Sequence, residues 1–235
     1  MRTRNWLWMI VAGAGGVSML GAAAQPEKPA TPPTQAPPTQ APAATPPRPE
    51  ATPPVAPDAA PAVPVSAYVL GYKVPDIDGV ERDLSQYKGK VVMIVNTASK
   101  CGYTWQYGTL EAMYQAHKDK GFVVLAFPSG DFKEQEFAEN RDIKAFCTAE
   151  DSKYKVTFPL FAKMHVKGKD AHPLFRQLAM QPGANGGEPS WNFTKWLVNR
   201  KGEVIAKFDT RISPDNDQVK AAIEAALSEK QSDAK

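Results

Sequence analysis

The stretch that decides the fold reads VVMIVNTASKCGYTWQY and covers residues 91–107. Its first five residues are apolar, mostly β-branched and preceded by a Lys-Gly-Lys turn signal, which predicts a buried strand. From Trp105 to Lys120 the apolar residues are spaced as on one face of a helix. Cys101 is therefore expected at a strand-to-helix turn, where free backbone N–H groups and the helix dipole favour an anion such as a thiolate.

On both sides of this stretch, the pattern continues as short strands and helices. A second apolar strand is expected directly after Gly121, which implies a parallel pair of strands joined by a right-handed crossover. The last helix is expected to begin with Ser213 as N-cap and Pro214 in its first turn. Further elements are predicted as a hairpin around Asp78-Gly79, a helix over 137–148, an edge strand over 156–161, a helix over 173–180 and a hairpin over 195–208. This order predicts an α/β domain with a thioredoxin-like fold, in which helices flank a central mixed sheet that an N-terminal hairpin caps.

Proline divides the chain into regions. Fifteen of the 22 prolines lie between Pro26 and Pro64, among Ala, Thr and Gln and without a periodic apolar face. Such a segment cannot bury enough apolar surface to offset the entropy lost on ordering. We interpret residues 25–65 as a Pro/Ala/Thr-rich disordered linker and residues 66–235 as a single domain of ordinary size.

The first 24 residues have the features of a targeting segment. Arg2 and Arg4 supply positive charge, the stretch from Trp6 to Leu20 is apolar or small, and Ala22 to Ala24 offers a cleavage site. Residues 1–24 are therefore predicted to be a signal peptide, and the protein is expected to be exported, periplasmic or secreted. The same segment is nearly long enough to remain as a membrane anchor, so a tethered protein stays an alternative.

Charge and histidine spacing narrow the range of functions. The 28 basic and 25 acidic residues give a net charge of +3 and are interleaved, which gives no support to nucleic-acid binding. His117, His165 and His172 are far apart and not at the spacing of metal ligands. We expect neither a metal site nor another cofactor.

The chain contains two cysteines, Cys101 and Cys147. A structural disulfide between them would be common in an exported protein. The turn at Cys101, with Lys100 beside it, instead favours a nucleophilic thiolate. A Cys-x-x-Cys exchange motif is excluded because the fourth position is Thr104. Composition alone leaves the structural and the nucleophilic reading open.

Four motifs carry a family resemblance. They are KVVMIVNTASKCGYTWQY over 90–107, FPSGDFKEQE over 127–136, TFPLFAK over 157–163 and WNFTKWLV over 191–198. In this order and spacing they resemble the glutathione peroxidase family, specifically its cysteine-containing, thioredoxin-dependent members. The resemblance extends from Ala67 to Ser228.

The resemblance implies a thioredoxin-fold peroxidase with Cys101 as the peroxidatic nucleophile. Its thiolate would attack the O–O bond of hydrogen peroxide or an organic hydroperoxide and become a sulfenic acid. Trp191 and Asn192 match two family positions that surround the sulfur, and both can donate hydrogen bonds to a thiolate and to the departing oxygen. Cys147 aligns with the cysteine that resolves the sulfenic acid as an intramolecular disulfide.

One expected donor is replaced. Where the family usually has Asn and Gln before Phe, this chain has Gly130 and Asp131. An ionised carboxylate cannot donate a hydrogen bond, and its charge would raise the pKa of the cysteine. Asp131 thus predicts a slower peroxidase, a carboxyl that is protonated or turned away, or a drifted activity. Gln135, four residues further on, is interpreted as a weak substitute.

The resemblance also suggests partners and a biological role. A thioredoxin-like dithiol protein or glutathione would act as the reductant, in a response to oxidative stress. The short loop over 181–190 resembles that of monomeric members, so a monomer is expected. The alternative function is a non-catalytic or impaired thioredoxin-fold module that a structural disulfide between Cys101 and Cys147 stabilises.

Overall fold

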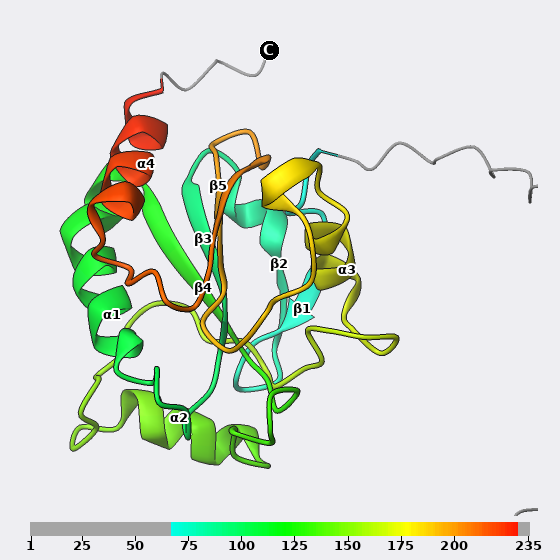
Figure 1. Cartoon of the computed structure of the whole chain (residues 1–235). Helices are drawn as coiled ribbons and strands as arrows, with labels where there is room; N and C mark the ends of the chain where they lie inside the picture. Colours follow the sequence, from blue (N-terminus) through cyan, green and yellow to red (C-terminus); the bar gives the residue numbers. More distant parts are fainter. Residues whose placement is uncertain (1–66, 230–235) are drawn as a thin grey trace, which may run out of the picture. The chain divides into compact units, whose positions relative to one another are not determined.

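The computed structural model describes residues 67–229, so the predicted signal peptide and linker lie outside the described residues. A four-stranded sheet forms the centre, in the spatial order β4-β3-β5-β6 (Figure 1). Its strands are β3 (Val91–Thr97), β4 (Phe122–Pro128), β5 (Lys195–Val198) and β6 (Val204–Phe208). β3 and β4 are parallel, whereas β5 is antiparallel to both of its neighbours. The prediction of a mixed central sheet is confirmed.

Strand β3 is buried on both faces and divides the core into two clusters. Successive side chains of a strand point to opposite faces. On one face, Val91, Met93 and Val95 pack with residues of α1 (Gln106–His117) and α4 (Asp217–Ser228). On the other face, Val92 and Ile94 pack with a second cluster that includes Val74, Leu84, Leu174, Phe175 and Leu178. The apolar run at 91–95 thus supplies both cores at once.

The second face is covered by α3 (Pro173–Ala179) and by the hairpin of β1 (Lys73–Pro75) and β2 (Glu81–Asp83) (Figure 1). Gly79 lies in the turn of this hairpin with a φ of 81°, in the region that favours glycine. The Asp-Gly turn signal therefore predicted the hairpin correctly.

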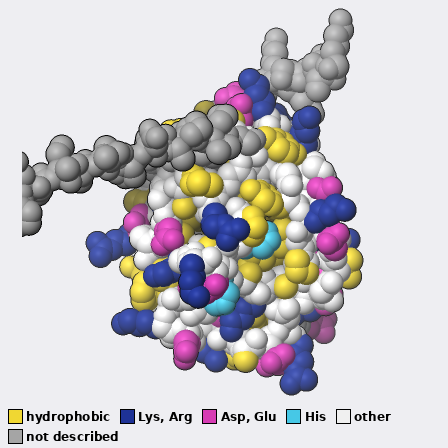
Figure 2. Space-filling model, turned by 90° about the vertical axis from the view of Figure 1, so that its right-hand side faces the viewer, with side chains coloured by type: hydrophobic (Ala, Val, Ile, Leu, Met, Phe, Trp, Pro, Cys, Tyr) yellow, Lys and Arg dark blue, Asp and Glu magenta, His cyan; other side chains and the backbone are white. Residues whose placement is uncertain are grey.

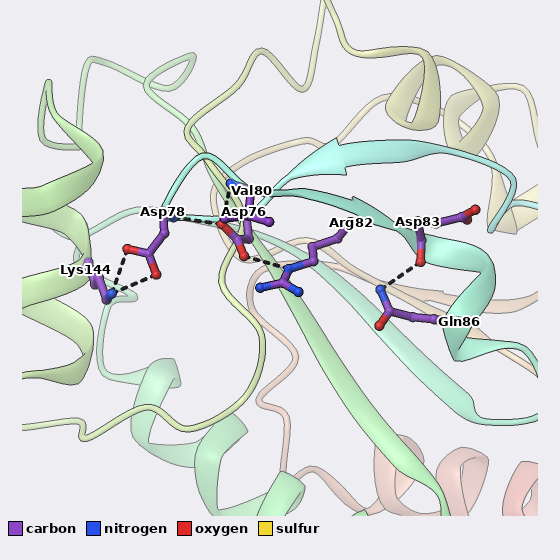
Figure 3. Close-up of polar contacts among 7 residues, drawn as sticks. All are labelled: Asp76, Asp78, Val80, Arg82, Asp83, Gln86 and Lys144. Atoms are coloured by element: carbon purple, nitrogen blue, oxygen red, sulfur yellow. Dashed lines mark hydrogen bonds and ion pairs between the residues drawn. The ribbon is translucent and has the colours of Figure 1, made fainter.

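A fourth helix, α2 (Asn140–Thr148), lies across the end of the sheet at which β3 ends (Figure 1). Polar contacts tie it to the N-terminal hairpin (Figure 3). The Asp76 carboxylate accepts the backbone N–H groups of Asp78 and Val80 and the side chain of Arg82, which fixes the hairpin turn. Lys144 on α2 then donates to both carboxylate oxygens of Asp78, at 2.7 and 2.8 Å. The hairpin is therefore joined to α2 by an ion pair at the surface.

The last helix begins later than predicted. Residues 213–216 form a turn in which the N–H of Asn216 donates to the carbonyl of Ser213. Asn216 is the N-cap, and its side chain accepts the N–H of Gln218 at 2.9 Å. Since Asn caps a helix as well as Ser does, the rule for N-caps does not separate the two positions.

The strand predicted over 156–161 does not form as a continuous element. Only isolated bridges occur there, between Asp76 and Phe161 and between Ala126 and Leu160. Pro159 has no N–H to donate and therefore interrupts the ladder of hydrogen bonds between strands. For the same reason the sequence predicted only an edge strand here.

The face with α3 and the hairpin carries mixed charges. Figure 2 shows Lys and Arg side chains interspersed with Asp and Glu and with hydrophobic groups on this face. It therefore presents no large field of one sign. Within residues 67–229, every helix is too short or too polar to cross a membrane.

Candidate active site

Cys101 lies in the turn between β3 and α1, as the sequence predicted. Its N–H donates to Thr104 Oγ1 at 3.0 Å, and that hydroxyl donates to the carbonyl of Ala98 at 2.9 Å. The N–H of Tyr103 donates to Cys101 Sγ at 3.4 Å. The sulfur is half-buried and accepts a backbone N–H, so one side of it faces the turn and the other remains accessible.

A neighbouring turn carries Trp191 and Asn192, and Asn96 near the end of β3 fixes it. The Asn96 amide donates to the carbonyl of Trp191 at 3.0 Å and accepts the N–H of Thr194 at 3.1 Å. The carbonyl of Asn96 accepts the N–H of Phe193 at 2.6 Å. Phe193 has a φ of 64°, in a region that costs a bulky residue about 1–3 kcal/mol. The same strand thus leads to Cys101 and holds both predicted donors.

A pocket of about 560 Å³ opens beside the Cys101 turn. Tyr103 and Trp191 line it together with Ser190, Asp209, Thr210, Arg211 and Ile212. The Trp191 ring also packs against Phe132, with 5.4 Å between ring centroids. Aromatic and aliphatic walls with a few polar groups suit a small organic molecule.

Gln135 lies closer to the site than the sequence suggested. Asn192, which is fully buried, donates from Nδ2 to Gln135 Oε1 at 3.0 Å. The carbonyl of Gln135 accepts the N–H of Lys100, the residue before Cys101, at 2.8 Å. Gln135 therefore joins Asn192, through its side chain, to the Cys101 turn, through its backbone carbonyl.

Backbone geometry explains the position of Gln135. Lys133 and Glu134 both have a positive φ, of 56° and 54°. The N–H of Glu134 donates to the carbonyl of Gly130, which closes a tight turn. This turn brings Gln135 to the site in place of Asp131. Neither Lys nor Glu signals a left-handed backbone, so the sequence contained no sign of it.

The Asp131 side chain is turned away from Asn192 and Gln135. Its carboxylate contacts His165 Nδ1 at 2.6 Å and accepts the backbone N–H groups of Val166 at 2.6 Å and Lys167 at 3.2 Å. Burial opposes ionisation, but the hydrogen bonds from Val166 and His165 outweigh it, so the pKa of Asp131 lies below its ordinary value. Of the expectations for this residue, these contacts favour the one with the carboxyl turned away, and the lowered pKa favours the ionised form.

Asp131→Asn is expected to lower the free energy of unfolding without changing the rate of peroxide reduction. Loss of charge-assisted bonds to His165 and Val166 should cost about 1–3 kcal/mol at neutral pH. Because the folded state lowers the pKa of Asp131, its stabilising effect exists at neutral pH and disappears as the pH falls through that pKa. Urea unfolding at neutral and acidic pH measures both effects.

Asp170→Asn is the control for that variant, because the Asp170 side chain is 65% exposed and should leave stability unchanged. A faster peroxide reaction in Asp131→Asn would contradict the placement of Asp131 away from the sulfur.

Glu136 is a site residue that the sequence analysis missed. It is buried, and its Oε1 accepts the N–H of Ser99 at 3.2 Å and of Phe137 at 2.8 Å. Burial raises the pKa of this carboxyl. Together with the bond from Lys100 to Gln135, these contacts attach the segment before Cys101 to the segment after Gln135.

Cys147 is a fully buried thiol at the end of α2. It belongs to the apolar cluster against which Cys101 packs, and both cysteines are free. Burial raises the pKa of Cys147 to about 12. Burial thus favours the protonated thiol, which is the less reactive form.

Comparisons with known proteins find relatives that share one family description. The profile described as glutathione peroxidase matches residues 69–179. The chain is 48% identical over 139 residues to the glutathione peroxidase homolog BsaA of Halalkalibacterium halodurans, covering 59% of this chain and 87% of the relative. It is 43% identical over 166 residues to the hydroperoxy fatty acid reductase gpx1 of Synechocystis sp., covering 68% and 95%. It is 39% identical to the thioredoxin/glutathione peroxidase BtuE of Escherichia coli, covering 68% and 97%.

Two solved structures are also similar to this chain. The crystal structure of Trgpx in its apo form superposes with a TM-score of 0.54 at 41% identity, covering 69% of this chain and 97% of Trgpx. T. cruzi GPX1 superposes with a TM-score of 0.51 at 31% identity, covering 68% and 96%. The predicted thioredoxin-like fold and the predicted resemblance are both confirmed.

Proposed function

This chain belongs to the glutathione peroxidase family and is a hydroperoxide-reducing oxidoreductase, and from this premise we propose that Cys101 is its peroxidatic residue. The observation that carries the proposal is the hydrogen bond from the N–H of Tyr103 to Cys101 Sγ in a strand-to-helix turn. The thiolate attacks one peroxide oxygen, the O–O bond breaks, and the other oxygen leaves with a proton as water or an alcohol. Cys101 is oxidised to a sulfenic acid.

Three side chains serve as donors around that reaction. The indole N–H of Trp191 is a pure donor, and the amides of Asn192 and Gln135 can each donate through their nitrogen. With Gln135 Oε1 occupied by Asn192, the Nε2 group of Gln135 keeps its own donors for another partner. Such preorganised donors stabilise the charge on the departing oxygen.

Cys147 completes the cycle as the resolving residue. Its thiol sulfur attacks the sulfur of Cys101, the S–O bond breaks, and water leaves with the thiol proton, which forms one disulfide. The end of α2 must open first, because two hydrogen bonds close it. Ser152 Oγ donates to the carbonyl of Phe146, and the N–H of Val156 donates to the carbonyl of Cys147. Opening also exposes the thiol and returns its pKa towards the ordinary value.

The reductant proposed here is a thioredoxin-like dithiol protein, since an intramolecular disulfide is the substrate of such proteins. Glutathione is the alternative, and the name of the relative from E. coli includes both reductants. The substrates are hydrogen peroxide and small organic hydroperoxides, for which the pocket beside Tyr103 has room. A monomeric enzyme, exported by means of residues 1–24 and active against oxidative stress, completes the proposal.

A coupled assay tests the choice of reductant. With hydrogen peroxide as substrate, turnover supported by thioredoxin and its reductase is expected to exceed turnover supported by glutathione and its reductase at least about tenfold, because only a dithiol reduces the disulfide in one encounter. Equal or greater turnover with glutathione would reject the dithiol and leave the peroxidatic role of Cys101 intact.

A further inference from the structure

Lys195, the first residue of β5, is a buried cation behind the site. Its side chain is fully buried, and within residues 67–229 it makes no ion pair with a carboxylate. Its Nζ donates to the carbonyl of Phe193 at 2.7 Å and to Gln106 Oε1 at 3.0 Å. A buried charge without a carboxylate partner costs stability, so packing alone does not explain a lysine here.

The contacts of Lys195 form part of a closed circuit of hydrogen bonds. Gln106 Nε2 donates to the carbonyl of Thr210 at 2.7 Å. The hydroxyl of Thr210 donates to the carbonyl of Asn192 at 2.8 Å. Gln106 and Thr210 are both buried. The circuit therefore leaves the turn at Phe193, passes through Lys195, Gln106 and Thr210, and returns to the turn at Asn192.

The turn from Trp191 to Thr194 is fixed by two separate sets of hydrogen bonds. Phe193 has a φ of 64°, which a bulky residue adopts only where its surroundings impose it. Asn96 accepts hydrogen bonds from the N–H groups of Phe193 and Thr194 and donates one to the carbonyl of Trp191. The carbonyls of Phe193 and Asn192 instead accept hydrogen bonds from the circuit, from Lys195 and Thr210. The directions of the Trp191 and Asn192 side chains thus depend on both supports.

We propose that Lys195 is a positioning residue of the peroxidatic site, whose Nζ group fixes the turn from Trp191 to Thr194 so that Trp191 and Asn192 donate towards Cys101. The proposal rests on the function proposed above for these two donors. Gln106, at the start of α1, joins the same support to the helix that follows Cys101. Lys195 touches no reacting atom and acts only through the turn.

The cost of the charge agrees with such a role. Burial lowers the pKa of Lys195 to about 7, and the carboxylate of Asp209 counteracts this only in part. Burying an amine without a carboxylate partner costs stability, and proteins accept such a cost where function requires the residue.

Lys195→Met separates the two effects. Because the variant removes a buried ionisable group and its unbranched side chain is only one atom shorter, the midpoint of urea unfolding at neutral pH is expected to stay or rise. The second-order rate constant for oxidation of Cys101 by hydrogen peroxide should fall about tenfold or more, since misplaced donors stabilise the departing oxygen less. An unchanged midpoint of unfolding together with slower oxidation is the result that a merely structural role of Lys195 would not produce.

Arg200→Met is the matched control. Arg200 is also a cation that donates to backbone carbonyls, those of Gly89, Lys120 and Leu227, but it follows the opposite end of β5. Its removal should lower the midpoint of unfolding and leave the rate of Cys101 oxidation unchanged, which is the reverse of the pattern for Lys195.

Gln106→Met provides a second line of evidence, which also decides the case if Lys195→Met does not fold. It should slow Cys101 oxidation as well, and the double variant should be no slower than the slower single variant, because both break one circuit. A wild-type rate in Lys195→Met, or in Gln106→Met where only that variant folds, would overturn the proposal, as would effects that multiply in the double variant. A wild-type protein whose Cys101 resists peroxide would instead overturn the function proposed for Cys101, and the role of Lys195 with it.

Discussion

Cys101→Ser is expected to abolish hydroperoxide reduction, with a loss of at least about 10³-fold, because a serine hydroxyl is hardly ionised at neutral pH and cannot form a sulfenic acid. The fold should survive the change. The bond from Cys101 to Thr104 is made by the backbone N–H, and the side chain is only partly buried. Peroxide consumption measured by stopped flow, with a dithiol reductant in excess, gives the comparison.

The control for this variant is Cys147→Ser, which keeps the nucleophile and loses only the second thiol. If Cys101→Ser still consumed its first equivalent of peroxide at the wild-type rate, the peroxidatic role would belong to another residue.

Cys147→Ser is expected to reduce the first equivalent of peroxide at the wild-type rate and then to stall. Without a second thiol, Cys101 should stay a sulfenic acid that a nucleophilic trapping reagent labels, and turnover with a dithiol protein should fall about 100-fold or more. Mass spectrometry of the peroxide-treated protein detects the label.

Cys147→Ala separates chemistry from packing, because Cys147 is fully buried and a serine hydroxyl there lacks an assured partner. Both variants should stall in the same way. Continued turnover with a dithiol protein in both would show that Cys101 sulfenic acid is reduced directly and that Cys147 only packs.

The sequence predicted the elements that periodicity and turn chemistry control. The continuous apolar, β-branched run over 91–95 predicted β3, and Gly121 predicted the end of the helical segment that follows Cys101. The position of Cys101 followed from the strand and the helix. The donors were harder to predict, because their placement depends on backbone conformation. Phe193 and the pair Lys133 and Glu134 adopt a positive φ that their residue types do not announce.

The placements of Asp131 and Gln135 have this common cause. In the motif Asp131 stands where the family has a donor, whereas the turn over 130–135 delivers Gln135 to Asn192. The burial of Lys195 could not be anticipated either, since a lysine at the start of a strand in a hairpin usually reaches solvent. Its partner Gln106 is 89 positions away in the sequence.

The most direct test of the central claim is a thiol count on the fully reduced wild-type protein before and after one equivalent of hydrogen peroxide. The account predicts that both thiols, Cys101 and Cys147, are lost at once at neutral pH and that one intramolecular disulfide joins them. Two free thiols that persist after minutes with the peroxide would contradict it.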